Sequence, residues 1–404
     1  MALGHLARMG RLARAYETFM VFLGLGLTSF GGPVAHLGYF HGAFVARRRW
    51  LSDADYADLV ALCQFLPGPA SSQVGMAIGY RRAGLAGAMA AFIAFTLPSV
   101  LLLWLVALGS TLWTGEAAQG VLHGLKLAAL AVVAQAVLQM AGRLTPDWPR
   151  RLLALVAAAI VLLVPHALVS VAVIALSALA GALLKPEAPT APARPAPSPT
   201  GSHPWAAAAL VLFVLLLATL PLLAMLTQNG WIDIADRFYR TGSLVFGGGH
   251  VVLPLLEREL VTPGLIDGDL FLAGYGAAQA VPGPLFSFAF YAGMLLEAPP
   301  NGMAGGLLAL GAIYLPSALL VLGALPFWDR LRAMPRLRGG LVLANAAVVG
   351  LLLAALIDPM ATSAIRGPAD IAIALAALAA LFSRVPPWLV VMTCGGLGWL
   401  LPPG

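Results

Sequence analysis

Two Pro-Gly-Pro motifs interrupt apolar sequence, one at Pro67-Gly68-Pro69 and one at Pro282-Gly283-Pro284. Proline stops the helix before it, and glycine adopts backbone angles that other residues avoid. Amide N–H groups are left unpaired where the chain restarts, at Ala70-Ser71-Ser72-Gln73 and at Leu285-Phe286-Ser287. Free amides and the helix dipole attract anions. We therefore expect an anion site at these breaks, with the nearby Ser and Gln side chains as further donors.

Two glutamines precede these motifs at the same spacing. Gln64 lies three residues before Pro67, and Gln279 lies three residues before Pro282. A side-chain amide both donates and accepts hydrogen bonds. Each glutamine could satisfy backbone groups that the break frees or bind substrate oxygens, and both roles stay open at this stage.

Lys126 lies in an apolar stretch, 121–140, that is otherwise almost without charge. A buried ammonium is costly enough to need a partner, so Lys126 is either an anion ligand or a structurally paired lysine. The aligned stretch of the second half, 341–349, has no cation but contains Asn345, which would make the site asymmetric. His36, His123 and His250 are candidates for proton coupling, although a lone histidine inside a membrane is more often a satisfied hydrogen-bond partner.

The breaks repeat at a distance of about 216 residues. Phe30-Gly31-Gly32 recurs as Phe246-Gly247-Gly248, and Leu97-Pro98-Ser99 recurs as Leu315-Pro316-Ser317. A single such break commonly only kinks a helix for packing. Different breaks at matched positions in both halves favour a secondary transporter, whose substrate path is built from interrupted helices.

Composition points to a membrane protein. The chain is 60% hydrophobic and 10% charged, with a mean hydropathy of +0.91, where a soluble domain has about 25% charged residues. The net charge of +6 comes from short cationic clusters between apolar runs, which indicates membrane topology and a lipid bilayer rather than nucleic acid. Cys63 and Cys394 lie within apolar segments, so we expect no disulfide framework, zinc site or other cofactor.

Apolar segments of membrane-helix length divide the chain. The first half has them near 18–45, 57–80, 84–113, 117–141, 151–165 and 167–184. The second half has them near 235–260, 270–296, 302–328, 339–357, 368–383 and 387–402, after an extra segment near 205–227. We therefore predict an all-α integral membrane protein in four parts: a first repeat at 1–184, a Pro-rich cytoplasmic linker at 185–204, an extra transmembrane helix at 205–230 and a second repeat at 231–404.

One extra helix between two even-numbered repeats inverts the second repeat. With a cytoplasmic N-terminus, most of the 23 Lys and Arg residues lie on the inner face, as the positive-inside rule requires. Arg47-Arg48-Arg49 conflicts with this unless segments 18–45 and 57–80 are re-entrant hairpins. The equivalent acidic connection around Glu257 and Asp267 would then be external. We favour hairpins, and broken spanning helices stay the alternative.

These residues carry a resemblance to the chromate ion transporter family in its long, two-domain form. It rests on Phe30-Gly31-Gly32-Pro33, on Phe246-Gly247-Gly248-Gly249-His250, on both Pro-Gly-Pro motifs with their glutamines, on Gly124-Leu125-Lys126 and on the stretch from Asn345 to Gly350. The resemblance covers both halves and implies a multi-pass carrier of the bacterial plasma membrane that exports chromate, with sulfate as the structural analogue. Pro33 against Gly249 shows that the two Gly-Gly breaks need not be equivalent.

The leading interpretation is secondary transport of a tetrahedral oxyanion by alternating access between inverted repeats. A passive anion channel and a sulfate importer are the alternatives. An enzyme is disfavoured because the sequence has no HExxH, GxSxG or Walker motif. The expected partners are chromate, sulfate as a second candidate, the lipid bilayer and, as one candidate assembly, a second copy of the chain. The candidate substrate-binding residues are Gly31, Gly32, Gln64, Pro67, Gly68, Pro69, Ser71, Ser72, Lys126, Gly247, Gly248, His250, Gln279, Pro282, Gly283, Pro284, Ser287 and Asn345.

Overall fold

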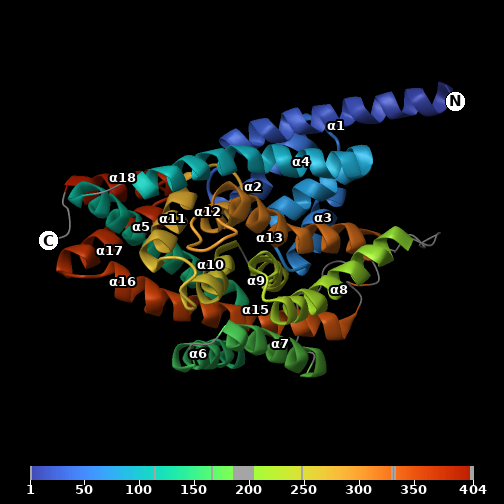
Figure 1. Cartoon of the computed structure of the whole chain (residues 1–404). Coiled ribbons are helices and arrows are strands. Elements are labelled where there is room, and N and C mark those ends of the chain that lie inside the picture. Colours follow the sequence, from blue (N-terminus) through green and yellow to red (C-terminus); the bar gives the residue numbers. More distant parts are fainter. Residues whose placement is uncertain are drawn as a thin grey trace.

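The computed structural model describes residues 2–112, 115–164, 167–184, 204–246, 249–328, 331 and 334–400. Every regular element within these ranges is a helix, which confirms the predicted all-α fold. Figure 1 shows α1 (Ala2–Thr28), α4 (Ala70–Leu112) and α15 (Pro335–Ala355) running roughly along one direction, with short helical pieces between them. α1 begins at one end of the molecule and α18 (Pro387–Leu400) ends near the other (Figure 1).

The first half consists of α1, α2 (Gly32–Phe40), η1 (His41–Arg47), α3 (Asp53–Phe65), α4, α5 (Glu116–Leu144), α6 (Trp148–Leu163) and α7 (Ala167–Leu184). Short polar side chains set the starts of two of these helices. Ser52 caps α3 by accepting a hydrogen bond from the amide of Asp55, and Asp147 caps α6 by accepting one from the amide of Arg150. These caps fix where each apolar run becomes helical.

The second half begins with the extra helix α8 (Pro204–Thr227). It continues with α9 (Gly230–Leu244), η2 (Gly249–Val251), α10 (Val252–Leu256), η3 (Glu257–Val261), α11 (Gly268–Ala280), η4 (Leu285–Ser287), α12 (Phe288–Met294), α13 (Gly302–Ala324), η5 (Leu325–Phe327), α15, η6 (Leu356–Ala361), α16 (Thr362–Ala364), α17 (Pro368–Phe382) and α18. The order of elements matches the predicted segments, with interruptions at Gly31, at both Pro-Gly-Pro motifs and between the end of α9 at Leu244 and the start of η2 at Gly249.

Several boundaries differ from the expectation. The first helix begins at Ala2 rather than near residue 18, because arginine is a good helix former and hydropathy marks only the apolar part of a helix. The predicted gap between 57–80 and 84–113 is confirmed, because the backbone within α4 leaves helical geometry at Ala83 and Gly84 and turns back, so that Gly79 packs on Gly87. Of the linker predicted at 185–204, residues 185–203 lie outside the described part of the chain, and Pro204 begins α8.

Glu17, which directly precedes the first predicted segment, contacts residues that follow the first and the second segment. Arg82, which follows segment 57–80, donates to the Glu17 carboxylate at 2.8 Å, and Arg48, which follows segment 18–45, lies 4.0 Å from it. The guanidinium groups of Arg48 and Arg82 also lie 5.9 and 4.8 Å from the centre of the Trp50 ring. The first segment therefore ends close to where it began, and the second ends beside Trp50, which precedes its start in the chain, as re-entrant hairpins would require.

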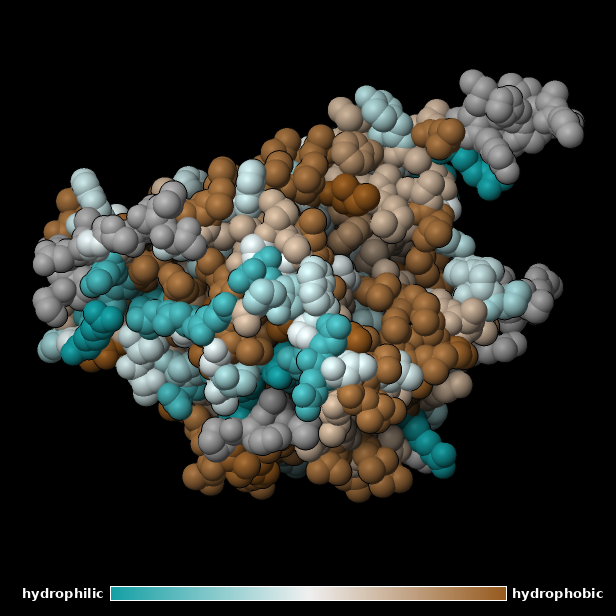
Figure 2. Space-filling model, in the orientation of Figure 1, coloured by the Kyte–Doolittle hydropathy of each residue, from teal (hydrophilic) through white to brown (hydrophobic). Residues whose placement is uncertain are grey.

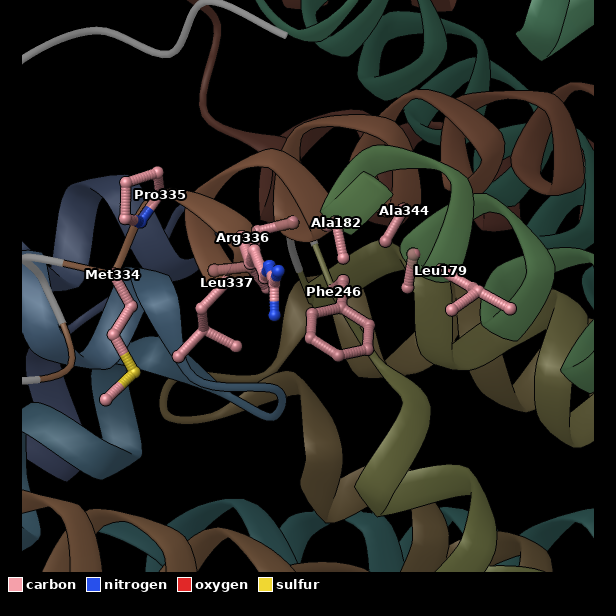
Figure 3. Close-up of a pocket in the computed structure, with 11 residues that line it drawn as sticks. Leu179, Ala182, Phe246, Met334, Pro335, Arg336, Leu337 and Ala344 are labelled. Carbon is pink, nitrogen blue, oxygen red and sulfur yellow. The ribbon is translucent and has the colours of Figure 1, made fainter. Parts of the chain in front are cut away.

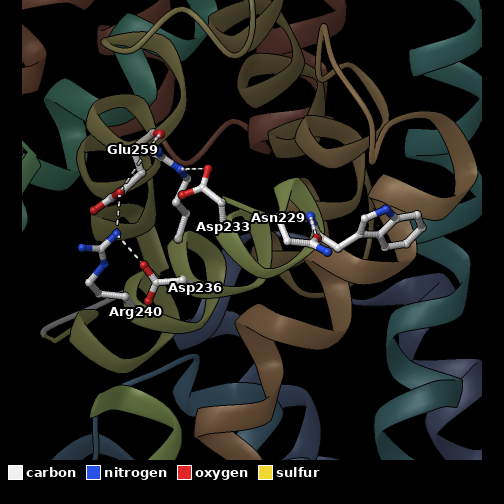
Figure 4. A network of polar contacts seen from close by, with 7 residues as sticks. Asn229, Asp233, Asp236, Arg240 and Glu259 are labelled. Carbon is white, nitrogen blue, oxygen red and sulfur yellow. Dashed lines mark hydrogen bonds and ion pairs between the residues drawn. The ribbon is translucent and has the colours of Figure 1, made fainter. Parts of the chain in front are cut away.

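The second half closes its first segment with a buried ionic network between α9 and η3 (Figure 4). Arg240 contacts Asp236 at 3.1 Å and Glu259 at 3.0 Å, and Arg237 contacts Asp233 at 2.8 Å and Glu259 at 3.6 Å. The side chains of Asp236 and Glu259 are only 6% and 5% exposed, so the two arginines are needed to compensate them. This segment also returns to its start.

The last helix of each half packs against a helix of the other half. α7 lies on α15 and α18 lies on α5. A Cβ at Gly181 would lie 2.2 Å from the carbonyl oxygen of Gly339, and one at Gly124 would lie 2.1 Å from the carbonyl oxygen of Cys394. Glycine permits such close helix contacts in membranes. The two halves are thus interlocked.

The surface suits a bilayer. Five helices among the described residues are long and apolar enough to cross a membrane, and the extra helix Pro204–Thr227 has the highest mean hydropathy of them, 2.8. None of its most apolar stretch is buried inside the protein, so it is available to lipid. Figure 2 shows hydrophobic residues over the region of α1 and α4 and over the edge formed by α6 and α7, with hydrophilic groups gathered between them and at one end.

We expect inverted topology to be visible in cysteine labelling of intact cells. Single cysteines at Arg48 and Asp267 should be labelled from opposite faces, cytoplasmic for the first and external for the second. The native Cys63 and Cys394 are buried, so their background labelling should be low. Labelling of both positions from one side would contradict the inversion, and external labelling at Arg48 would replace hairpins with broken spanning helices.

Candidate functional site

The two Pro-Gly-Pro breaks are hydrogen bonded to each other's repeat. The amide of Gly68 donates to the carbonyl of Val245 at 2.7 Å, and the amide of Gly283 donates to the carbonyl of Ser29 at 2.9 Å. Ser29 and Val245 are equivalent residues, each directly before the Phe of a Gly-Gly break. The pairing is therefore reciprocal, and it places each Pro-Gly-Pro break next to the residues that precede the Gly-Gly motif of the other half.

Glycine is required at the centre of each motif. Gly68 has φ of +118° and Gly283 has φ of +102°, a region that other L-residues rarely enter. A Cβ at Gly68 would lie 2.1 Å from Ser317 Oγ, and one at Gly283 would lie 3.1 Å from Ser99 Oγ. Both serines belong to the repeated Leu-Pro-Ser motifs, so each Pro-Gly-Pro break packs against the Leu-Pro-Ser of the other half.

We call the place where the two Pro-Gly-Pro breaks are paired the crossing. Six buried hydroxyl groups lie around it, and we call them the hydroxyl cluster: Ser72, Thr96 and Ser99 on α4, Ser287 on η4, and Tyr314 and Ser317 on α13. Ser99 and Ser287 share a hydrogen bond of 2.6 Å. The Tyr314 hydroxyl lies beside those of Ser72, Thr96 and Ser287. Sequence reasoning singled out Ser72 and Ser287 but missed the other four as site residues. The available signal was that Thr96 and Tyr314 directly precede the repeated Leu-Pro-Ser motifs.

Several polar atoms at this crossing have no partner among the described residues. They are the hydroxyl oxygens of Ser29, Ser72, Thr96, Tyr314 and Ser317, and Oε1 of Gln73. Ser72, Thr96 and Tyr314 are each 3% exposed and Ser317 is 0% exposed. A buried group without a hydrogen bond costs about 1–3 kcal/mol. Such a concentration of unsatisfied groups indicates a place that receives a polar ligand or ordered water.

The two Gly-Gly breaks also touch. A Cβ at Gly249 would lie 3.3 Å from the ring of Pro33, its equivalent in the first half. The Pro33 ring packs closely against Gly249, where a side chain would leave too little room. This contact explains why the first repeat has proline and the second has glycine at this position. Gly31 and Gly32 have φ of +96° and +77°, as a break before α2 requires. The candidate residues Gly247 and Gly248 lie outside the described residues.

Among the glutamine and histidine candidates, some are hydrogen bonded inside the protein and one is exposed. Gln73 donates to the carbonyl of Pro67 at 2.7 Å, so a side chain satisfies part of the first break. Gln64 is exposed. Gln279 is close to Tyr275, whose hydroxyl is 2.9 Å from Nδ1 of His250. His36 Nδ1 is 3.4 Å from Ser71 Oγ, which places the first-half pair next to Ser72.

Lys126 has a protein partner. Its side chain is 2% exposed, and its ammonium group donates to Asp269 at 2.8 Å and to the carbonyl of Ser363 at 3.3 Å. One turn earlier on α5, His123 Nε2 lies 2.7 Å from Asp370. Both contacts join the first half to the second. Asn345 is half-buried on α15, and its Oδ1 has no partner among the described residues. The roles of Lys126 and Asn345 as substrate ligands stay predictions.

A pocket of about 690 Å³ lies between α7, α15 and Phe246 (Figure 3). Its lining is apolar, including Leu179 and Ala182, and Arg336 is its charged lining residue. An oxyanion site needs several hydrogen-bond donors on its walls. This pocket therefore differs in chemistry from the hydroxyl cluster, although Phe246 places it next to the second Gly-Gly break.

Buried helix breaks that are paired between two halves of an all-α membrane protein define a membrane transport protein. A family model described as Chromate transporter matches residues 16–182 and 232–399, and the chain belongs to this family. The resemblance stated from the motifs is thereby confirmed, and the multi-pass membrane character agrees with it.

Individual relatives support the assignment. The chain is 28% identical over 407 residues to the chromate transport protein of Pseudomonas aeruginosa, covering 96% of this chain and 92% of that protein. It is 28% identical over 373 residues to the chromate transport protein of Cupriavidus metallidurans, covering 90% and 86%. It is also 26% identical over 343 residues to an uncharacterized transporter of Methanocaldococcus jannaschii, covering 84% and 83%. No solved structure shows a significant match to the chain.

Proposed function

We propose that this protein is a secondary active transporter that exports tetrahedral oxyanions, chromate foremost and sulfate as its analogue, by alternating access between two inverted repeats. The observation that carries the proposal is the reciprocal hydrogen bonding of Gly68 to Val245 and of Gly283 to Ser29. A site formed jointly by equivalent breaks of two repeats can change its exposure when one repeat moves against the other. The names of the relatives favour chromate.

The protein would reside in the bacterial plasma membrane with a cytoplasmic N-terminus. Re-entrant hairpins would bring Gly68 and Gly283 towards each other from opposite faces, so their meeting point would lie near the bilayer midplane. Transport would require no cofactor and no covalent chemistry. A homodimer is compatible with the exposed apolar helices, but the proposed path lies within one chain.

Purified protein in proteoliposomes tests this function. Uptake of labelled chromate and sulfate should saturate with concentration and should depend on an imposed pH or voltage gradient. A passive channel would instead show flux that follows the anion's own electrochemical gradient without an opposing ion. Absence of flux for both anions under every gradient would contradict oxyanion transport, and accumulation of sulfate alone would favour the importer.

A further inference from the structure

We propose that the hydroxyl cluster itself binds the transported oxyanion through uncharged donors, and that Tyr314 is its principal specificity-determining residue. This inference rests on the proposed transport function and identifies the side chains that contact the substrate. Its members form three pairs at equivalent positions of the repeats: Ser72 with Ser287, Thr96 with Tyr314, and Ser99 with Ser317. Both halves therefore contribute equally to one site.

The unpartnered oxygens carry the argument. The hydroxyl oxygens of Ser99 and Ser287 lie 2.6 Å apart, and each also lies within hydrogen-bond distance of a backbone carbonyl of its own segment, so both have partners. Although the Tyr314 hydroxyl lies beside those of Ser72 and Thr96, the hydroxyls of Ser72, Thr96, Tyr314 and Ser317 form no hydrogen bond of normal geometry among the described residues, and all four residues are at least nine-tenths buried. A hydroxyl can rotate its hydrogen towards an incoming acceptor. A four-oxygen anion supplies acceptors in several directions, which suits hydroxyl donors that come from different helices.

Two buried cations, Lys126 and Arg240, are already compensated by carboxylates. Lys126 is bonded to Asp269, and Arg240 is bonded to both Asp236 and Glu259. Uncharged hydroxyls can still bind an anion strongly, because a hydrogen bond to a charged acceptor is about twice as strong as one between neutral groups. A site without fixed positive charge also releases a dianion more readily than a site built on a buried cation. Both properties suit a carrier, which must bind and release at each cycle.

Tyr314 makes the cluster asymmetric. Its counterpart Thr96 is smaller, and the phenol reaches the hydroxyls of both halves, beside Ser72 and Ser287. The ring is held by Phe92 and Phe286, whose centroids lie 4.8 and 5.9 Å from its own. A donor on a rigid, packed ring has a fixed position. Its distance from the other hydroxyls should therefore set the size of anion that the cluster accepts.

Isosteric variants of the full chain test the proposal. Ser72→Ala, Thr96→Val, Tyr314→Phe and Ser317→Ala each remove one hydroxyl and little volume. We expect the Kd for chromate and for sulfate, measured by calorimetry on purified protein, to rise about tenfold to a hundredfold in each variant. Tyr314→Phe should cause the largest rise and should also change the ratio of the two Kd values. Ser243→Ala and Thr145→Val are matched controls, because their buried hydroxyls are bonded to carbonyls of their own helices.

Thermal stability without anion provides a second readout. Removing an unsatisfied hydroxyl should leave the melting temperature of the anion-free protein unchanged or higher, whereas removing a structural hydroxyl should lower it. Cluster variants that melt lower and keep the wild-type Kd would overturn the inference. Variants whose Kd for chromate and for sulfate stays within twofold of the wild-type value would overturn it whatever their melting temperature. If the wild-type protein binds and transports no oxyanion, the proposed function itself fails.

Discussion

Replacing Gly68 with alanine is expected to lower chromate transport about a hundredfold or more. The left-handed backbone conformation costs an L-residue about 1–2 kcal/mol, and the new Cβ would lie 2.1 Å from Ser317 Oγ. The side chain of Ser317 or the whole break must then move, which disturbs the hydrogen bond from Gly68 to Val245. Uptake into proteoliposomes, normalised to correctly folded protein, measures the effect.

Gly84→Ala is a matched control for this substitution. Gly84 also has a positive φ, of +67°, but no atom lies within 4 Å of its Cβ position. It therefore shares the backbone cost without the contact. Gly283→Ala should have an intermediate effect, because its nearest neighbour would be Ser99 Oγ at 3.1 Å. Equal transport by the Gly68 and Gly84 variants would show that the geometry of the break is not needed for function.

Removing Asp269 is expected to destabilise the protein more than removing Lys126. Asp269→Asn leaves a buried ammonium uncompensated and should cost up to about 3 kcal/mol, the lower end for buried pairs, because Asp269 itself is 53% exposed. Lys126→Gln leaves a carboxylate that water can still reach. The double variant should recover most of the stability lost in Asp269→Asn, as measured by thermal unfolding in detergent.

His41 and Asp53 provide the control pair. Their side chains are 46% and 83% exposed, so Asp53→Asn should change stability by less than about 1 kcal/mol. The same variants also test Lys126 as an oxyanion ligand. A tenfold loss of chromate affinity in a well-folded Lys126→Gln, Asp269→Asn double variant would retain Lys126 in the site. An unchanged Kd would leave Lys126 as a structural link between the halves. Equal stability of the wild type, the two single variants at Lys126 and Asp269 and the double variant would contradict the ion pair.

The helix breaks and the order of segments could be predicted from sequence because they depend on local chemistry. Proline and glycine interrupt a helix wherever they occur in it, and a second copy of each motif reduces the chance of a local accident. The cluster Arg47-Arg48-Arg49 even indicated hairpins, and Arg48 lies close to Glu17 in the structure. The ends of helices were harder to predict from the sequence. α1, for example, includes arginines that an argument from hydropathy leaves out of the helix.

Contacts between the halves could not be predicted in the same way. Lys126 clearly needed a partner, but nothing local identifies Asp269, which lies 143 residues away. Gln64 and Gln279 occupy matched sequence positions, yet one is exposed and the other approaches Tyr275. Thr96 and Tyr314 were overlooked because hydroxyl residues are ordinary in apolar helices. Their importance comes from what surrounds them in three dimensions.

The reciprocal bonds across the crossing also bear on how the chain is made. The amide of Gly68 takes its acceptor from Val245, and the amide of Gly283 takes its acceptor from Ser29. During synthesis at about 5–20 residues per second, the first half must wait roughly 10–40 s for the second. Throughout that interval the amide of Gly68 lacks its acceptor, the carbonyl of Val245, although its segment is already inserted in the membrane. The first repeat can therefore complete its backbone hydrogen bonding only after the second repeat of the same chain has been synthesised and inserted.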